Sequence, residues 1–79
     1  MAVNAYILIQ TEVGKAAQVA RQVRQLSGVA AADDVTGPYD VIVRAEVETM
    51  TELGRNVVGP MQVIEGITKT LTCPVVDLE

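Results

Sequence analysis

The chain has 79 residues, of which 49% are hydrophobic, and it carries six basic against ten acidic side chains, for a formal net charge of −4. This length fits one small domain, and no stretch approaches the roughly 18 consecutive apolar residues that a membrane span requires. Because an acidic chain without clustered Lys or Arg is unsuited to neutralising phosphates, neither direct DNA binding nor a membrane partner is expected.

The first half of the chain predicts a strand, a helix and a second strand. Residues 3–10 alternate as a strand does, with apolar side chains on both faces. From residue 15 to residue 26 the apolar side chains recur at helical spacing, and Gly28 follows as a usual residue beyond a helix end. Residues 29–35 predict a second, weaker strand, because they contain three Ala and two Asp.

The second half predicts the same kinds of element. A Gly-Pro turn leads into residues 39–47, which have the strongest strand pattern in the chain. Thr49 and Glu52 match a capping box, in which each side chain satisfies an otherwise unpaired N–H at the start of a helix. A second helix is therefore expected to begin near residue 50. Its apolar stripe is expected to comprise Met50, Leu53, Val57, Met61 and Ile64.

Pro60 is expected to kink or interrupt this second helix, because proline cannot donate the helical hydrogen bond. Residues 67–76 then predict a fourth strand. Its side chains are expected to alternate between two faces, with Ile67, Leu71, Cys73 and Val75 on one and Thr68, Thr70 and Thr72 on the other.

The two halves echo each other in sequence as well as in element order. Ile7-Leu8-Ile9 resembles Val41-Ile42-Val43, and Gly28 and Gly66 both follow an expected helix. Two right-handed βαβ-like units in the order βαββαβ predict an α+β, ferredoxin-like fold. Such a fold has a four-stranded antiparallel sheet with both helices on one face.

The other face of this sheet is expected to be uncovered and to bind a partner. A solvated sheet face normally alternates cleanly between apolar and polar, yet Tyr6, Leu8 and Ile42 are expected to point away from the helices. An exposed apolar patch of this kind is typical of a partner surface. We therefore predict a homodimer formed sheet to sheet, with larger rings through the sheet edges. The expected patch comprises Tyr6, Leu8, Ile42, Thr68, Thr70 and Thr72.

The segment Gly37-Pro38-Tyr39-Asp40 is the best candidate for a site. It places a tight turn and a carboxylate between two apolar strands. An Asp after such a turn can hold a ligand's ammonium, or it can cap the turn by accepting backbone N–H groups, and both interpretations stay open for Asp40. Gly37 is expected to supply a positive φ or a close backbone approach.

Other residue types argue against an enzyme. The chain has no His, a single Cys and no glycine-rich phosphate loop, so no catalytic residue, metal site or cofactor is expected. The lone Cys73 is expected to be a buried, inert thiol, and it cannot form an internal disulfide. The opening Met-Ala-Val-Asn lacks the basic region of a signal peptide, so a cytoplasmic location is expected.

Three segments together resemble the effector domain of the Lrp/AsnC family of transcription regulators, often called the regulation of amino-acid metabolism (RAM) domain. They are the run Tyr6-Ile7-Leu8-Ile9, the Gly37–Asp40 turn with the strand after it, and the ending from Glu65 to Thr72. The resemblance covers nearly the whole chain. It implies dimers formed through the sheets, rings of dimers, and small effectors, often amino acids, held between dimers.

In the family, a helix-turn-helix domain usually precedes this module. The first expected strand begins almost at Met1, so a single stand-alone effector and oligomerisation domain over residues 1–79, without a DNA-binding domain, is expected. Pro38 departs from the family pattern, where a polar residue is common, and would stiffen the loop; Glu65 stands where proline is common. The resemblance implies ligand contacts at Gly37, Pro38, Tyr39, Asp40, Thr70 and Thr72.

The function implied is a sensor of a small molecule, such as an amino acid, that modulates full-length Lrp/AsnC regulators by mixed assembly. A ligand-free structural partner of such regulators is the first alternative. The second is a small ferredoxin-like dimeric enzyme working through Asp40 and Tyr39 in a cavity between sheet and helices.

Overall fold

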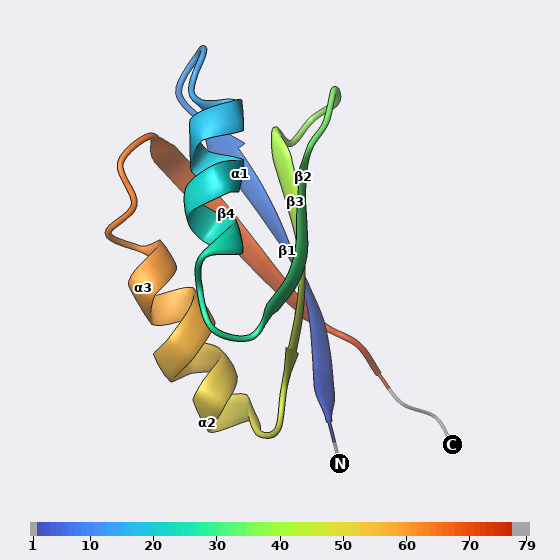
Figure 1. Ribbon diagram of the computed structural model, residues 1–79. Helices are drawn as coiled ribbons and strands as arrows, with labels where there is room; N and C mark the ends of the chain where they lie inside the picture. The colour runs from blue at the N-terminus through green and yellow to red at the C-terminus, as the bar shows by residue number, and fades with distance from the viewer. Residues whose placement is uncertain (1, 77–79) are drawn as a thin grey trace.

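The computed structural model describes residues 2–76, which form one sheet with helices packed in front of it (Figure 1). The strands are β1 (Val3–Thr11), β2 (Val29–Asp34), β3 (Val41–Val47) and β4 (Ile67–Pro74). The first helix is α1 (Ala16–Arg24). The second helical segment passes through α2 (Met50–Glu52), the π-helical turn η1 (Leu53–Val58) and α3 (Gly59–Met61).

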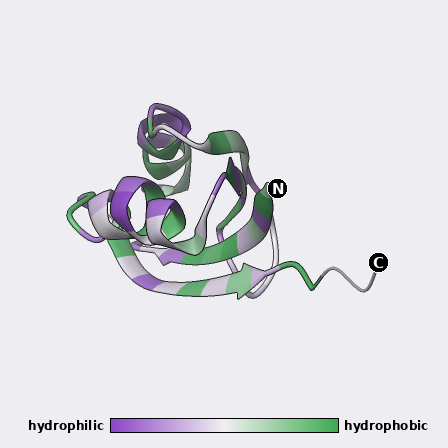
Figure 2. Cartoon of the chain, turned by 90° about the horizontal axis from the view of Figure 1, so that it is seen from below, coloured by the Kyte–Doolittle hydropathy of each residue, from purple (hydrophilic) through white to green (hydrophobic). Residues whose placement is uncertain are grey.

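The sheet has the strand order β2-β3-β1-β4, and all neighbouring strands are antiparallel. The predicted ferredoxin-like α+β fold is therefore confirmed. Seen from below, both helical segments lie on the same side of the curved sheet (Figure 2). Among residues 2–76, nothing covers the opposite face of the sheet.

One-sided burial sets the packing of the sheet. The seven residues of β3 alternate strictly between buried and exposed, as one buried face requires. Each fully buried Val or Ile side chain contributes on the order of 1.5–3 kcal/mol through the hydrophobic effect. No polar or charged side chain is buried within the described part of the chain. The core comprises Ala5, Ile7, Ile9, Val19, Ala20, Val23, Ala32, Val41, Val43, Ala45, Val47, Leu53, Val57 and Met61.

The two turns from helix to strand repeat each other, in agreement with the sequence echo. Gly28 has a φ of 94°, and its carbonyl accepts a hydrogen bond from Glu46 N at 2.8 Å. Gly66 has a φ of 101°, and its carbonyl accepts one from Glu12 N, also at 2.8 Å. A Cβ at Gly28 would lie 2.8 Å from Cγ1 of Val47. Conformation and space therefore both require glycine there.

The second helical segment begins with the predicted capping box. Thr49 Oγ1 accepts from Glu52 N at 3.0 Å, and Glu52 Oε1 accepts from Glu48 N at 3.0 Å. Two N–H groups at the helix start are thereby satisfied, as expected.

The interruption expected from Pro60 takes the form of the π-helical turn η1. Gly59 N donates to Gly54 O, a step of five residues that widens the helix just before Pro60. The predicted apolar stripe is right at Leu53, Val57 and Met61, which are buried, and wrong at its first member, since Met50 is 55% exposed.

The strand β4 turns Thr70 and Thr72 toward the helices, so the prediction that these two lie on the uncovered face was wrong. Thr70 and Thr72 lie opposite Ile9 and Ile7, which are fully buried under the helices. Directly opposed residues of an antiparallel pair share a face. Gln62, after α3, also reaches Thr70 Oγ1 with its Nε2 at 3.4 Å.

The phase of this edge strand could not be predicted from its own sequence. A shift of one residue exchanges the two faces, and the pairing with β1 decides the phase. Leu71 therefore lies opposite Leu8, and Cys73 lies opposite Tyr6, both on the uncovered face. Cys73 is exposed, so the prediction of a buried thiol was also wrong.

The contact at Gly28 gives a test of the packing. Gly28→Ala adds both backbone strain and a clash with Val47, whereas Gly14→Ala, at a φ of 81° with no atom within 4 Å of the new Cβ, adds strain alone. We expect Gly14→Ala to cost about 1 kcal/mol and Gly28→Ala about 1–3 kcal/mol more. Urea denaturation at one protein concentration measures both; equal losses would contradict the packing described.

Candidate functional site

The hairpin loop between β2 and β3 carries four of the six predicted ligand-binding residues. It lies at the end of the sheet opposite the N terminus (Figure 1). Gly37 and Pro38 are exposed, while Tyr39 and Asp40 are half-buried. The loop therefore offers accessible backbone at its tip, and its base is held against the sheet.

Hydrogen bonds from β1 hold this base. Asp40 N donates to Ile9 O at 2.8 Å, and Thr11 N donates to Asp40 Oδ2 at 2.8 Å. Gln10 Nε2 donates to Pro38 O at 3.1 Å. The Asp40 carboxylate is thus engaged by backbone of a neighbouring strand, which favours the capping interpretation of Asp40, although the partner lies outside its own loop.

Gly37 has the expected positive φ. Its value is 158°, a backbone conformation that residues with a side chain rarely adopt, whereas a Cβ built there meets no atom within 4 Å. Conformation, and not a close approach of other atoms, therefore favours glycine at this position.

The two predicted threonines lie apart from the loop. Thr70 pairs with Ile9 and Thr72 with Ile7 on one side of β1, whereas Val41, the first residue after the loop, pairs with Ile9 on the other side. Two strand spacings, about 10 Å, therefore separate the backbones of Thr70 and Val41. A ligand would have to bridge β1 to touch both the loop and these hydroxyls within one protomer.

The uncovered sheet face is a second candidate surface. On it, the aliphatic side chains of Leu8, Ile42 and Leu71 form a row across the three strands β3, β1 and β4. Tyr6, 46% exposed, lies in the next row beside Cys73. We call these five residues, Tyr6, Leu8, Ile42, Leu71 and Cys73, the apolar sheet patch. It is the kind of surface that partners cover.

One ion pair borders the apolar sheet patch. Arg44 Nη2 lies 2.6 Å from Glu46 Oε2 on β3, and both side chains remain about half exposed. An exposed pair of this kind contributes little stability by itself.

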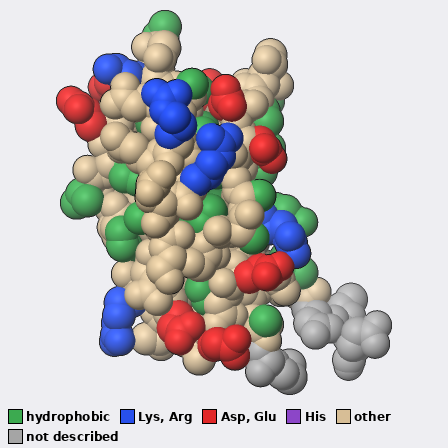
Figure 3. Space-filling view, viewed as in Figure 1, with side chains coloured by type: hydrophobic (Ala, Val, Ile, Leu, Met, Phe, Trp, Pro, Cys, Tyr) green, Lys and Arg blue, Asp and Glu red, His purple; other side chains and the backbone are tan. Residues whose placement is uncertain are grey.

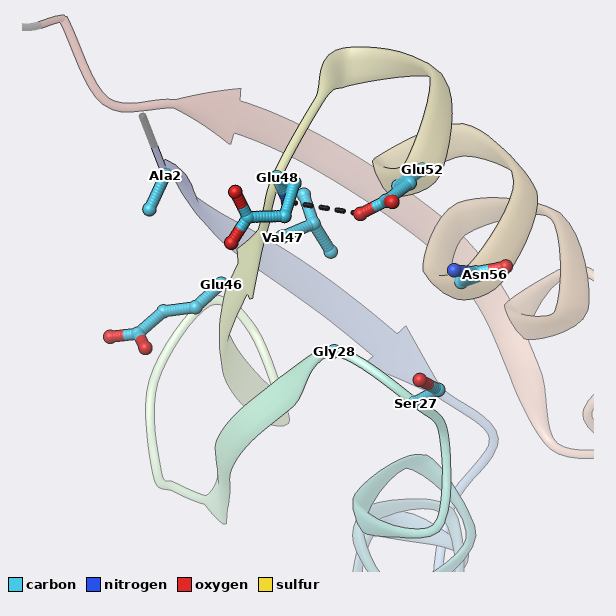
Figure 4. A pocket seen from close by; sticks show the side chains of 8 residues that line it. All are labelled: Ala2, Ser27, Gly28, Glu46, Val47, Glu48, Glu52 and Asn56. Atoms are coloured by element: carbon cyan, nitrogen blue, oxygen red, sulfur yellow. Dashed lines mark hydrogen bonds between the residues drawn. The ribbon is translucent and has the colours of Figure 1, made fainter.

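A hollow of about 310 Å³ lies at the end of the molecule beside α2, away from the loop. Figure 4 shows three carboxylates around it, from Glu46, Glu48 and Glu52, with Asn56 and Ser27 nearby. In Figure 3, several acidic side chains lie near α2 and several basic ones lie over α1, and both kinds also occur elsewhere on this side of the molecule. Part of this acidity is structural, since Glu52 caps the helix start through Glu48 N.

Two further features are absent from residues 2–76. No group of three or more His, Cys, Asp or Glu is placed to hold a metal ion among them. None of their helices is both long and apolar enough to cross a membrane.

The sequence and the fold both match a known family of proteins. A family model described as the Lrp/AsnC ligand binding domain matches residues 4–77. The chain belongs to the Lrp/AsnC ligand binding domain family. This confirms the resemblance noted in the sequence. No relative among curated proteins matches the chain.

Solved structures place this Lrp/AsnC domain among proteins of similar size and among longer regulators. TTHA0845 of Thermus thermophilus superposes with a TM-score of 0.89 at 25% identity, covering 98% of this chain and 96% of that one. The hypothetical protein PHS023 of Pyrococcus horikoshii gives 0.85 at 30% identity, covering 94% and 89%. The transcriptional regulator NMB0573 of Neisseria meningitidis, crystallised as an L-Met complex, gives 0.77 at 19% identity over 96% of this chain and 51% of that one, which shows the fold alone.

Two residues of this Lrp/AsnC domain contact the loop without having been singled out from the sequence. Gln10 and Thr11 end β1, and they meet the loop only because β3 pairs with β1. Their separation of about 30 residues from the loop leaves no local signal in the sequence.

The helix start beside the hollow gives a test of the capping box. Glu52→Ala removes the acceptor for Glu48 N, so we expect a loss of about 1 kcal/mol in unfolding free energy. Glu48→Ala removes a neighbouring exposed carboxylate but keeps that backbone donor, and it should change stability by less than about 0.5 kcal/mol. Denaturant melts of both variants, with Glu52→Gln as the isosteric control, measure the difference; equal losses would contradict the capping role.

Proposed function

We propose that this Lrp/AsnC domain senses a small molecule, with an amino acid as the expected ligand, and couples binding to the assembly of subunits. The observation that carries the proposal is the match of residues 4–77 to a ligand-binding domain family in a chain whose β2–β3 loop is exposed at its tip and tied at its base. The regulator NMB0573, solved with L-Met, supports an amino acid as the class of ligand.

The proposed ligand-binding site comprises Gly37, Pro38, Tyr39 and Asp40 of the loop, together with Thr70 and Thr72. Within one protomer β1 separates the threonines from the loop, so we propose that a neighbouring subunit completes the site by bringing its Thr70 and Thr72 toward the loop. Exposed peptide groups at the loop tip suit an amino acid, because a backbone N–H can donate to its carboxylate and a backbone C=O can accept from its ammonium.

For assembly, we propose a homodimer in which two copies of the apolar sheet patch face each other. A small domain of this length buries only about 60% of the surface of its unfolded chain, so covering an aliphatic face adds stability that the monomer lacks. A twofold interface needs a self-complementary surface, and an aliphatic row such as Leu8, Ile42 and Leu71 is one. Rings of dimers, and mixed assembly with full-length Lrp/AsnC regulators, are proposed as the route to transcription control.

Two alternatives predict different behaviour. A ligand-free assembly partner would be recovered with Lrp/AsnC regulators from cell extract whether or not amino acids are present. A small enzyme would need polar groups in a cavity between sheet and helices, whereas that layer is packed with aliphatic side chains. We therefore favour the sensor over the enzyme.

Ligand sensing is tested by titration calorimetry of the purified protein with each common amino acid, backed by melting temperatures. We expect at least one to release heat and raise the melting temperature, because a ligand that binds only the folded state stabilises it. The corresponding D-amino acid is the control for a specific site. Absence of heat and of any melting shift with all of them would refute sensing of amino acids.

Sheet-to-sheet assembly is tested by Leu71→Asp, which puts a charge into the apolar sheet patch. We expect the dimer dissociation constant to rise at least about tenfold, because a buried unpaired carboxylate opposes association. Val63→Asp is the matched control, since Val63 is 85% exposed and lies after α3, outside the patch. Analytical ultracentrifugation measures both; equal behaviour would exclude the patch as the dimer interface.

A further inference from the structure

The loop Gly37–Asp40 leads into β3 and lies just beyond the end of the backbone ladder between β1 and β3. The last paired residues of this ladder are Ile9 and Val41. Every second N–H of a strand points to the same neighbour, so Thr11 N points toward β3 beyond that pair. Asp40 Oδ2 accepts this N–H at 2.8 Å. The carboxylate thus replaces a main-chain carbonyl and adds one more bond between the strands.

Gln10 fastens the loop at a second point and also reaches the edge strand. Its side-chain Nε2 donates to Pro38 O at 3.1 Å, and its main-chain carbonyl accepts from Thr68 Oγ1 at 3.2 Å. The register of β1 with β4 shifts between Gln10 and Thr11, so the regular backbone ladder is interrupted there. The main-chain carbonyl of Gln10 accepts from the Thr68 hydroxyl at this point. One residue therefore joins the loop to β4.

Resting on the proposed function, we infer that Asp40 and Gln10 are positioning residues of the effector loop. They hold the loop against β1, and the exposed peptide groups of Gly37 and Pro38 contact the ligand in place of the Asp40 carboxylate. Two contacts with β1, at Pro38 O and at Asp40 Oδ2, determine how those peptide groups are presented. Gln10 also connects the loop to the edge strand through its bond with Thr68.

A positioning role and a direct ionic role require different things of Asp40. To hold Thr11 N, the side chain needs an acceptor oxygen, which asparagine also has. To neutralise a ligand's ammonium it needs the negative charge, which asparagine lacks. Asp40→Asn therefore separates the two roles, and Asp40→Ala removes both.

The experiment combines hydrogen exchange of the Thr11 amide, followed by NMR, with calorimetric affinity for the best amino acid ligand. Asp40→Ala should speed exchange of Thr11 and weaken ligand binding, each about tenfold or more, since a hydrogen bond to a charged group is lost. Asp40→Asn should keep both within about threefold of the unchanged protein. Asp34→Asn, at an exposed carboxylate on the same hairpin, is the matched control and should change neither.

Gln10→Glu keeps the shape of the side chain but removes the donor to Pro38 O. It should weaken ligand binding several-fold while Thr11 stays protected, since the Asp40 contact is intact. Unchanged binding in this variant would contradict the role of Gln10. The variant also tests whether the loop is held from β1 if Asp40→Ala does not fold.

Two results would overturn the role of Asp40. One is an Asp40→Asn protein that keeps Thr11 protected but loses binding, because the charge would then contact the ligand. The other is an unchanged rate of Thr11 amide exchange in Asp40→Ala, because the carboxylate would then not protect the Thr11 N–H. If no amino acid binds the unchanged protein, the proposed function fails separately, and Thr11 exchange still decides whether Asp40 holds the loop.

Discussion

Burial of a single sheet face under the helices is the constraint on which the rest of this domain depends. The aliphatic residues of β1 and β3 that point toward α1 and η1 are excluded from water, and this burial is the largest favourable contribution to the fold. The requirement to fill one face leaves the other uncovered. That second face carries aliphatic residues of its own, so the arrangement that stabilises the monomer also provides its surface for association.

The same pairing of β1 with β3 creates the candidate site. Because the chain turns back at Gly37–Asp40, the loop returns beside the end of β1, and residues about 30 positions apart come into contact. Asp40 and Gln10 then complete hydrogen bonds that the ladder no longer provides. Side-chain hydrogen bonds therefore extend the contact between the loop and β1 beyond the regular ladder, and the exposed tip stands on this hydrogen-bonded base.

Local patterns predicted the elements well. Alternation in β1 and β3, the helical spacing before Gly28 and the capping box at Thr49 act over a few residues, so the chain itself carries their signals. The errors fall where that signal is ambiguous. The strand β4 lies at an edge, either phase of its alternation is plausible, and so the faces of Thr70 and Cys73 were exchanged. Met50 was likewise placed in a stripe that begins one turn later.

By itself, the sequence determined the order of elements, the ferredoxin-like fold, the position of the loop and the resemblance to the Lrp/AsnC family. These follow from short-range periodicity, turn residues and motif order, which need no partner strand. Only the tertiary structure decided the phase of β4, the exposure of Cys73 and the bonds from Gln10 and Thr11 to the loop. The physical reason is register: strand pairing joins distant residues, and a shift of one position reverses every face.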